Sequence, residues 1–230
     1  MAYEVIQINE NTWRIEDNQH VRFFLLTGED NALLIDSGMT VTNAKDIAEE
    51  LTDLPIMLIN THGDRDHVAS NHQFETFFMS AAEAANYYNV QKMTGEFTPI
   101  EDGDVIELGG RPLAVVSLPG HTPGSIGIID VNNKVLFGGD PIQDGMIFMF
   151  GEQREMHAYR SSLEKISEYG EFFDVIYPSH GTCPVQPELI GELYDVSGRL
   201  ADEAFPRWEM DFHGRTVTCV DTGVAKFLID

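Results

Sequence analysis

The chain has 230 residues, 43% of them hydrophobic, and no linker or composition break divides residues 1–230, so we expect one domain with a layered core. Its 38 Asp and Glu residues outnumber its 14 Lys and Arg residues, giving a formal net charge of -24 at pH 7. Because such a surface repels phosphate backbones and anionic lipids, we expect neither a nucleic-acid partner nor a membrane partner.

The first part of the chain has the pattern of consecutive strands. Short apolar segments at residues 5–8, 12–15, 21–26 and 32–35 alternate with turn-forming residues, which predicts an antiparallel opening. Asp36 follows the last of these segments, and residues 42–51 then have helical spacing. A carboxylate directly after a buried strand is more often a cap or turn residue than a catalyst, so we expect Asp36 to support a site rather than to react.

A cluster of ionisable residues follows the apolar run at 56–59. The segment 61–67 reads Thr-His-Gly-Asp-Arg-Asp-His and contains His62, Asp64, Asp66 and His67. Alternate residues of an extended segment point the same way, so the first three share one face, and a short turn brings the fourth alongside. A divalent cation usually compensates such crowding, which favours a metal site over the alternative, a solvated loop rich in His and Asp.

The remaining elements form two series of strands and helices. We expect helices at 68–77, 81–88, 156–169 and 187–204, strands at 105–108, 113–118, 126–131, 134–138 and 175–177, and a terminal hairpin at 216–229 that turns at 221–223. Strands followed by helices, twice along the chain, predict two sheets face to face with helices outside.

Three further segments each end an apolar strand in small residues and one ligand-type side chain. They present His121 in Pro-Gly-His-Thr-Pro-Gly, Asp140 in Gly-Gly-Asp and His180 in Pro-Ser-His-Gly. Glycines beside each residue allow the close backbone approach that a crowded metal cluster requires. Each segment alone is weak evidence, because a lone His or a Gly-Gly-Asp is more often structural.

Together and in this order, these segments resemble the metallo-beta-lactamase fold superfamily of metallohydrolases, in its glyoxalase II-like and lactonase-like branch. The resemblance runs from Leu-Leu-Ile-Asp-Ser-Gly at 33–38 to His180 and Gly181. It implies an α+β fold, a four-layer αββα sandwich of two mixed sheets. It also implies two divalent metal ions, with zinc expected and iron or manganese as alternatives.

The resemblance assigns each candidate ligand. The first metal would be held by His62, Asp64 and His121, the second by Asp66, His67 and His180, and Asp140 would bridge them. Asp36 matches a buried carboxylate that steadies the ligand loops.

One position departs from the commonest form of the motif, His-x-His-x-Asp-His, because Asp64 stands where the second His is usual. A carboxylate binds the same cations through oxygen, so we expect both metals to be held in a harder, more anionic site. Loss of the first metal is the alternative. The related domain of flavodiiron proteins has Glu at this position, so a diiron redox enzyme is a second hypothesis, and a non-catalytic metal-binding sensor of the same fold is a third.

Two cations sharing a hydroxide would need no Ser or Cys nucleophile, and Asp66 could orient the attacking water or carry its proton as the catalytic residue. We therefore expect hydrolysis of a small ester, thioester, lactone or related acyl compound. The main class of true beta-lactamases has Cys where Asp140 stands, so penicillin cleavage is not expected.

Substrate selection is expected from the apolar segment 141–150. Met146, Phe148 and Phe150, with Tyr159 on the following helix, are candidates for a pocket that holds a small-molecule substrate. The segment could instead be a core strand or a contact in a homodimer.

The location of the protein follows from weaker signals. The N-terminal segment has neither a basic start nor an apolar stretch typical of a signal peptide, and no run approaches the roughly 18 apolar residues of a membrane span. Cys183 and Cys219 are too few for a disulfide framework. We therefore expect a cytoplasmic protein.

Overall fold

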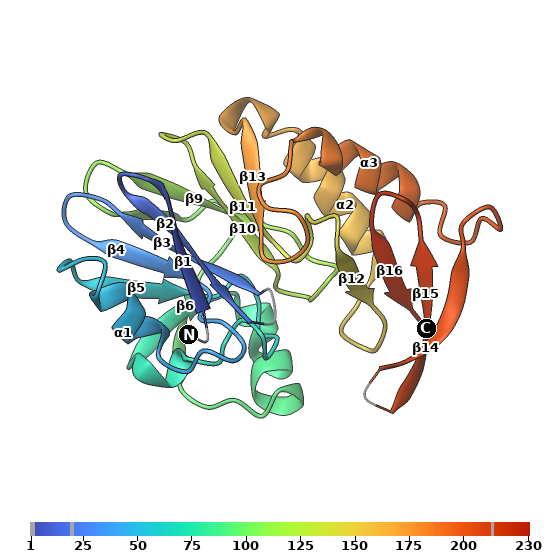
Figure 1. The fold of residues 1–230 in the computed structure, drawn as a ribbon, viewed down its shortest axis with the longest axis horizontal. Coiled ribbons are helices and arrows are strands. Elements are labelled where there is room, and N and C mark those ends of the chain that lie inside the picture. The colour runs from blue at the N-terminus through green and yellow to red at the C-terminus, as the bar shows by residue number, and fades with distance from the viewer. Residues whose placement is uncertain (1–2, 19–20, 213) are drawn as a thin grey trace.

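The computed structural model describes residues 3–18, 21–212 and 214–230. Figure 1 shows a twisted sheet that contains the N-terminal strands, a second sheet beside it and two long helices beyond the second sheet. The first sheet has seven strands in the order of the chain, antiparallel up to β4 and parallel from β4 to β7. Its strands are β1 (Tyr3–Asn9), β2 (Thr12–Asp17), β3 (Arg22–Thr27), β4 (Ala32–Ile35), β5 (Ile56–Ile59), β6 (Thr76–Met79) and β7 (Glu96–Pro99).

The second sheet has five strands in the order β13-β11-β10-β9-β8. Its strands are β8 (Val105–Glu107), β9 (Pro112–Ser117), β10 (Ile126–Asp130), β11 (Val135–Gly139) and β13 (Val175–Pro178). Neighbours are antiparallel except β11 and β13, which run parallel.

A hydrophobic core lies between each pair of neighbouring layers. Phe24, Ile59 and Phe137 belong to the core between the two sheets. The other face of the first sheet packs on α1 (Ala44–Glu49). The other face of the second sheet packs on α2 (Met156–Ser167) and α3 (Glu188–Ser197). The order helix, sheet, sheet, helices is the expected αββα sandwich.

A third sheet, which the sequence analysis did not predict, lies beside α2 and α3 (Figure 1). Its strand order is β12-β16-β15-β14, with β12 (Met146–Met149) parallel to β16 (Lys226–Ile229). The predicted terminal hairpin is confirmed as β15 (Arg215–Asp221) and β16, whereas β14 (Arg207–Phe212) was not expected. The segment 141–150 therefore contains a strand, which was one of the alternatives considered for it.

One predicted helix is wrong, and a second is confirmed but has an unexpected hydrogen-bonding pattern. Residues 68–77 contain only a 3-10 turn, η1 (Asn71–Gln73), before strand β6, because parallel pairing with β5 and β7 outweighs the helical spacing. Residues 81–88 are helical, as predicted, and form a 3-10 turn, η2 (Ala81–Glu83), followed by a π-helix, η3 (Ala85–Val90). A further 3-10 turn, η4 (Gly170–Phe172), follows α2.

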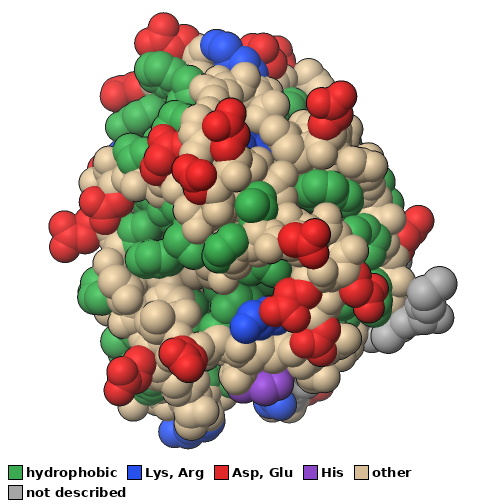
Figure 2. Space-filling model, turned by 90° about the vertical axis from the view of Figure 1, so that its left-hand side faces the viewer, with side chains coloured by type: hydrophobic (Ala, Val, Ile, Leu, Met, Phe, Trp, Pro, Cys, Tyr) green, Lys and Arg blue, Asp and Glu red, His purple; other side chains and the backbone are tan. Residues whose placement is uncertain are grey.

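One face of the molecule shows how the acidic side chains are distributed. Figure 2 shows Asp and Glu side chains dispersed over one face, with few Lys or Arg side chains among them. Among the described residues, no helix combines the length and the apolar character needed to cross a membrane.

Candidate metal centre

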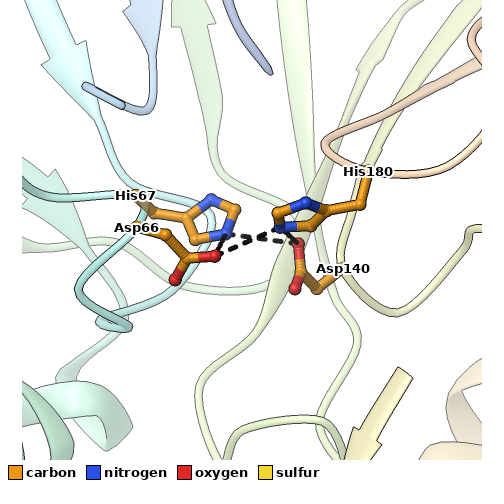
Figure 3. Close-up of side chains that lie close together, drawn as sticks. All are labelled: Asp66, His67, Asp140 and His180. Carbon is orange, nitrogen blue, oxygen red and sulfur yellow. Dashed lines mark ion pairs between the residues drawn. The ribbon is translucent and has the colours of Figure 1, made fainter. Parts of the chain in front are cut away.

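The loops that follow β4, β5, β9, β11 and β13 bring together ligand-type side chains from five places in the sequence. One group contains Asp66, His67, Asp140 and His180, whose ligand atoms all lie within 4.8 Å of one another. The Nε2 atom of His67 lies 3.5 Å from Asp66 Oδ2 and 3.2 Å from Asp140 Oδ1. His180 Nε2 lies 3.2 and 3.4 Å from the same two oxygens. Figure 3 shows these four side chains converging from opposite sides.

A second group contains His62, His121 and again Asp140. His121 Nε2 lies 3.5 Å from Asp140 Oδ2, whereas His67 and His180 approach Oδ1. The two oxygens of one buried carboxylate therefore face different groups. This is the arrangement that a bridging ligand requires.

The two groups pass a test of fit to metal ions. Ligand atoms bound to a tetrahedral cation at about 2.1 Å lie roughly 3.4 Å from one another, and the distances above run from 3.2 to 3.5 Å. The Nε2 atoms of His62, His67 and His121 and Oδ1 of Asp140 are buried and make no hydrogen bond within the described part of the chain. Buried polar atoms rarely lack a partner, so these atoms are suited to a cation.

Asp64 has two environments, one on each oxygen. Its Oδ2 lies 3.6 Å from His62 Nε2 and 3.5 Å from His121 Nε2, close enough to add a ligand to the second group. The same oxygen accepts a hydrogen bond from Arg154 Nη2 at 2.5 Å. Its Oδ1 accepts hydrogen bonds from Asn86 Nδ2 at 2.8 Å and Gln91 Nε2 at 3.2 Å.

The π-helix explains how two amides reach one oxygen. Gln91 N donates to the carbonyl of Asn86, so the side chains five residues apart project to one side, which a regular α-helix would not allow. The partners of Asp64 lie 22, 27 and 90 residues away, so the sequence analysis missed them. No motif in the sequence would have identified them.

Three of the imidazoles are oriented by contacts on Nδ1. His67 Nδ1 lies 2.8 Å from Asp36 Oδ2, His62 Nδ1 lies 3.1 Å from Thr61 Oγ1, and His121 Nδ1 lies 3.0 Å from the carbonyl oxygen of Phe148. Each contact leaves Nε2 directed at the site. Such contacts fix the tautomer and the ring orientation of metal-binding histidines.

Asp36 anchors this arrangement. It is 1% exposed, and its two oxygens accept hydrogen bonds from the backbone N and the hydroxyl of Thr61, each at 2.7 Å, in addition to the contact with His67. Its φ of 64° is in the left-handed region, which Asp tolerates better than most residues. The carboxylate thus connects β4 to the ligand loop after β5.

The pKa values of the candidate ligands follow from burial and mutual charge. Burial raises the pKa of Asp66, but the charge of His67 and the hydrogen bond with His180 outweigh it and hold the pKa well below its usual value. Burial lowers the pKa of His67, but the charges of Asp66, Asp140 and Asp36 raise that pKa well above its usual value. The pKa of His121 is lowered, by burial first and by the charge of Arg154 second.

The four residues expected to line a substrate pocket have different surroundings. Tyr159 of α2 is fully buried in the core between the second sheet and the helices, and its hydroxyl donates a hydrogen bond to the carbonyl of Pro141. The prediction that Tyr159 lines a substrate pocket is therefore wrong. Met146 is exposed on β12. Phe148 and Phe150 are partly buried and pack against Phe212 of β14, with ring centroids 4.8 and 5.4 Å away. Phe148 lies on β12, and its carbonyl oxygen contacts Nδ1 of His121.

Known proteins resemble the chain in sequence and in fold. Acyl-coenzyme A thioesterase MBLAC2 of Homo sapiens is 24% identical over 208 residues, which cover 72% of this chain and 74% of that protein. Hydroxyacylglutathione hydrolase GloC of Haemophilus influenzae is 32% identical over 139 residues, covering 52% and 65%. A metallo-beta-lactamase from Pontibacter korlensis superposes with a TM-score of 0.72 at 18% identity, over 85% of this chain and 99% of that one.

The family model of the metallo-beta-lactamase superfamily matches residues 19–180, a span that contains Asp36 and every candidate ligand. The match agrees with the αββα layers and with the two groups of ligand atoms that share Asp140. The named relatives are hydrolases. The chain therefore belongs to the metallo-beta-lactamase superfamily, and it is a metal-dependent hydrolase of that superfamily.

Proposed function

We propose that the chain hydrolyses a small acyl compound, a thioester or an ester, at a pair of divalent cations. The observation that carries this proposal is the shared carboxylate of Asp140, with Oδ1 facing His67 and His180 and Oδ2 facing His121. The names of the relatives, acyl-coenzyme A thioesterase and hydroxyacylglutathione hydrolase, support an acyl substrate. Zinc is the proposed metal.

We propose the division of ligands that the sequence analysis expected. Asp66, His67 and His180 would hold one ion, His62, Asp64 and His121 the other, and Asp140 both. Two cations held in this way make a bound water acidic near neutral pH and polarise a carbonyl oxygen. The side chains then have to orient the attacking water, hold its proton and release the leaving group.

Asp66 is the residue best placed to handle the proton. Its side chain is 27% exposed, whereas the side chains of His67 and Asp140 are 0% and 9% exposed, so Asp66 can contact both water and substrate. Its pKa lies well below its usual value, because the charge of His67 and the hydrogen bond with His180 outweigh the effect of burial, and it is therefore a carboxylate at neutral pH. A thiol leaving group with a pKa of about 8.5 departs without strong acid catalysis, which suits this weakly basic residue.

Arg154 offsets the charge that Asp64 introduces. Asp64 places an anion where the commonest motif has a neutral imidazole, and the guanidinium contacts the same oxygen that faces His62 and His121. The pair adds no net charge to the site. The sequence predicted a more anionic site than usual, but the charge of Arg154 offsets the additional negative charge of Asp64.

The acyl group is proposed to lie against the aromatic side chains of Phe148, Phe150 and Phe212. These rings pack on one another at the surface of the third sheet and remain partly exposed. The carbonyl of Phe148 contacts His121, so this sheet is coupled directly to the metal ligands. Apolar rings beside a polar centre are typical of sites for acyl substrates.

Iron-dependent redox chemistry is the second candidate, and the carboxylate of Asp64 is the observation that favours it, because oxygen ligands suit iron. The test is metal analysis and a visible spectrum of protein purified without added metal, followed by assays on aryl esters, lactones and acyl thioesters. The proposal requires colourless, zinc-containing protein whose hydrolysis is lost in D66N. Coloured, iron-containing protein without hydrolysis would reject it.

A further inference from the structure

Glu83 is a buried carboxylate that no motif identified. It is 0% exposed and ends the short turn η2. Its Oε1 accepts a hydrogen bond from the backbone N of Gly124 at 2.7 Å, and its Oε2 accepts one from the backbone N of Gly63 at 2.7 Å. Asn86 Nδ2 donates to Oε2 at 3.1 Å. Three donors thus satisfy both oxygens of this buried carboxylate.

The two backbone donors lie in the two loops that supply His62, Asp64 and His121. Gly63 stands between His62 and Asp64, and Gly124 follows His121 by three residues. These loops come after different sheets, since β5 belongs to the first sheet and β9 to the second. One carboxylate therefore connects two ligand loops that share neither a strand nor a sheet.

The two glycines are required by the closeness of Glu83. A Cβ at Gly63 would lie 2.9 Å from Glu83 Oε2, and a Cβ at Gly124 would lie 2.9 Å from Glu83 Cγ. Neither distance is tolerated by real side chains, so any residue other than Gly would push the carboxylate or the loop away. The requirement comes from packing, because neither glycine has a positive φ.

Asn86 extends the network to Asp64. Its side-chain amide donates to Glu83 Oε2 at 3.1 Å and to Asp64 Oδ1 at 2.8 Å. The other group of ligands depends on different anchors, since His67 is held by Asp36, and Asp140 and His180 follow β11 and β13. The contacts of Glu83 thus fall next to His62, Asp64 and His121. Among the described residues, Asp66 and His67, which stand further along the same loop as Gly63, make no contact with it that resembles these.

We propose that Glu83 is a positioning residue for the metal ion at His62, Asp64 and His121, and that it acts by holding the loops of Gly63 and Gly124 at a fixed distance. This inference rests on the proposed two-metal function. It concerns the arrangement of ligands rather than contact with the substrate. Residues that orient metal ligands typically change metal affinity by about 10–100-fold when they are replaced.

The test is the E83Q variant, because Gln keeps the shape of Glu but offers one oxygen and one amide group. Whichever way the amide turns, one of the two backbone N–H groups faces another donor and loses its partner. Zn²⁺ binding to metal-free protein is measured by competition with a chromophoric chelator. We expect one of the two ions to bind about 10–100-fold more weakly in E83Q and the other to be unchanged.

The matched control is D130N. Asp130 is also a 0% exposed carboxylate, with donors from Arg111 and Asn133, but it lies away from the ligand loops. D130N should lower thermal stability and leave the affinity for both ions unchanged. If E83Q does not fold, G124A provides the same test, since its Cβ displaces Glu83, and the same selective weakening is expected.

The inference would be overturned if folded E83Q or G124A bound each ion with the same affinity as the wild type. It would also be overturned if the variant lost affinity for both ions to the same extent, or if D130N showed the same selective loss. Selective weakening without hydrolysis of any ester or thioester by the wild type would support the role of Glu83 and reject the proposed reaction. Hydrolysis by the wild type with no change of metal affinity in E83Q would support the proposed reaction and reject the role of Glu83.

Discussion

A metal ion that binds at this site would have to displace protons from its histidines. Although burial lowers the pKa of His67, the carboxylates of Asp66, Asp140 and Asp36 raise it well above its usual value. Burial also lowers the pKa of His180, and Asp140 and Asp66 raise it. The pKa values of Asp66 and Asp140 are lowered, because the charges of the histidines outweigh burial. In the absence of metal, the site is thus a set of ion pairs.

These shifts set the pH dependence of stability. The raised pKa of His67 stabilises the folded protein below an unfolded-state pKa of about 6.5, and this contribution is lost as the pH rises through the folded-state value. The lowered pKa values of Asp66 and Asp140 stabilise it above about pH 4, and this contribution is lost on acidification. In EDTA we expect the thermal midpoint to be highest between about pH 4 and 6.5 and to fall toward pH 9.

Thermal melts across this pH range, with EDTA and with saturating Zn²⁺, check this prediction. Because the metal takes neutral imidazoles and carboxylates, Zn²⁺ should stabilise the protein most at the alkaline end. A melting temperature in EDTA that rises from pH 6.5 to 9 would contradict it.

Arg154 gives a second prediction at the scale of single residues. Replacing it by Met leaves the charge of Asp64 uncompensated beside His62 and His121. The more negative site should bind the ion more tightly and make its water less acidic, so the acidic limb of kcat/KM against pH should move upward by about one pH unit or more. R154K, which keeps the charge, is the control. Equal profiles for R154M and wild type would show that Arg154 does not balance Asp64.

The convergence of the candidate ligands could be predicted from the sequence, because the segments that carry them follow apolar strands and strand ends meet at one edge of a sheet. The partners of Asp64 and the two backbone donors to Glu83 could not be predicted in this way. They come from turns, a π-helix and a loop, and their distances along the chain, from 20 to 90 residues, carry no periodic signal. Only the packed fold brings them together.

At the scale of elements, the strand β12 has two different faces. Ile147 and Met149 pack into the core beside α2, while Phe148 lies with Phe150 and Phe212 on the other side. The apolar sequence of this segment indicated burial but not which face would be free. The parallel partner β16 decides this, and it lies about 80 residues further along the chain.

This division predicts different effects for two aromatic residues. Y159F removes a buried hydroxyl that donates to Pro141, so it should lower the free energy of unfolding by about 1 kcal/mol and leave KM unchanged. F212A removes a partly exposed ring from the proposed acyl site and should raise KM about 5- to 10-fold for a long acyl chain and little for an acetyl group. Unfolding curves and KM values for the two chain lengths check both. If KM rose in Y159F but not in F212A, Tyr159 rather than Phe212 would belong to the acyl site.

The wrong helix at 68–77 has a similar cause. Its spacing is compatible with a helix, but Thr76–Met79 pairs with strands on both sides, and Ser70 and Asn71 make buried hydrogen bonds with the loops around them. Local spacing cannot report these non-local contacts. The αββα order was predictable because it depends only on the sequence of element types.

At the scale of the whole molecule, the net charge of -24 opposes anionic substrates. For two thioesters with the same acyl group, one on a neutral thiol and one on an anionic thiol, kcat/KM of the anionic substrate should rise between 10 and 300 mM salt, because the Debye length falls from about 30 to less than 8 Å. The neutral substrate should change little. A fall in kcat/KM for the anionic substrate would indicate local attraction stronger than the overall repulsion.

The central claim is that the chain holds two cations at ligands spread from residue 62 to residue 180. Anomalous diffraction from crystals of the metal-loaded protein, collected at the absorption edges of zinc, iron and manganese, tests it most directly. The account predicts two peaks at the zinc edge, one beside His67 and His180, one beside His62 and His121, with Asp140 between them. A single peak, or none among these side chains, would contradict it.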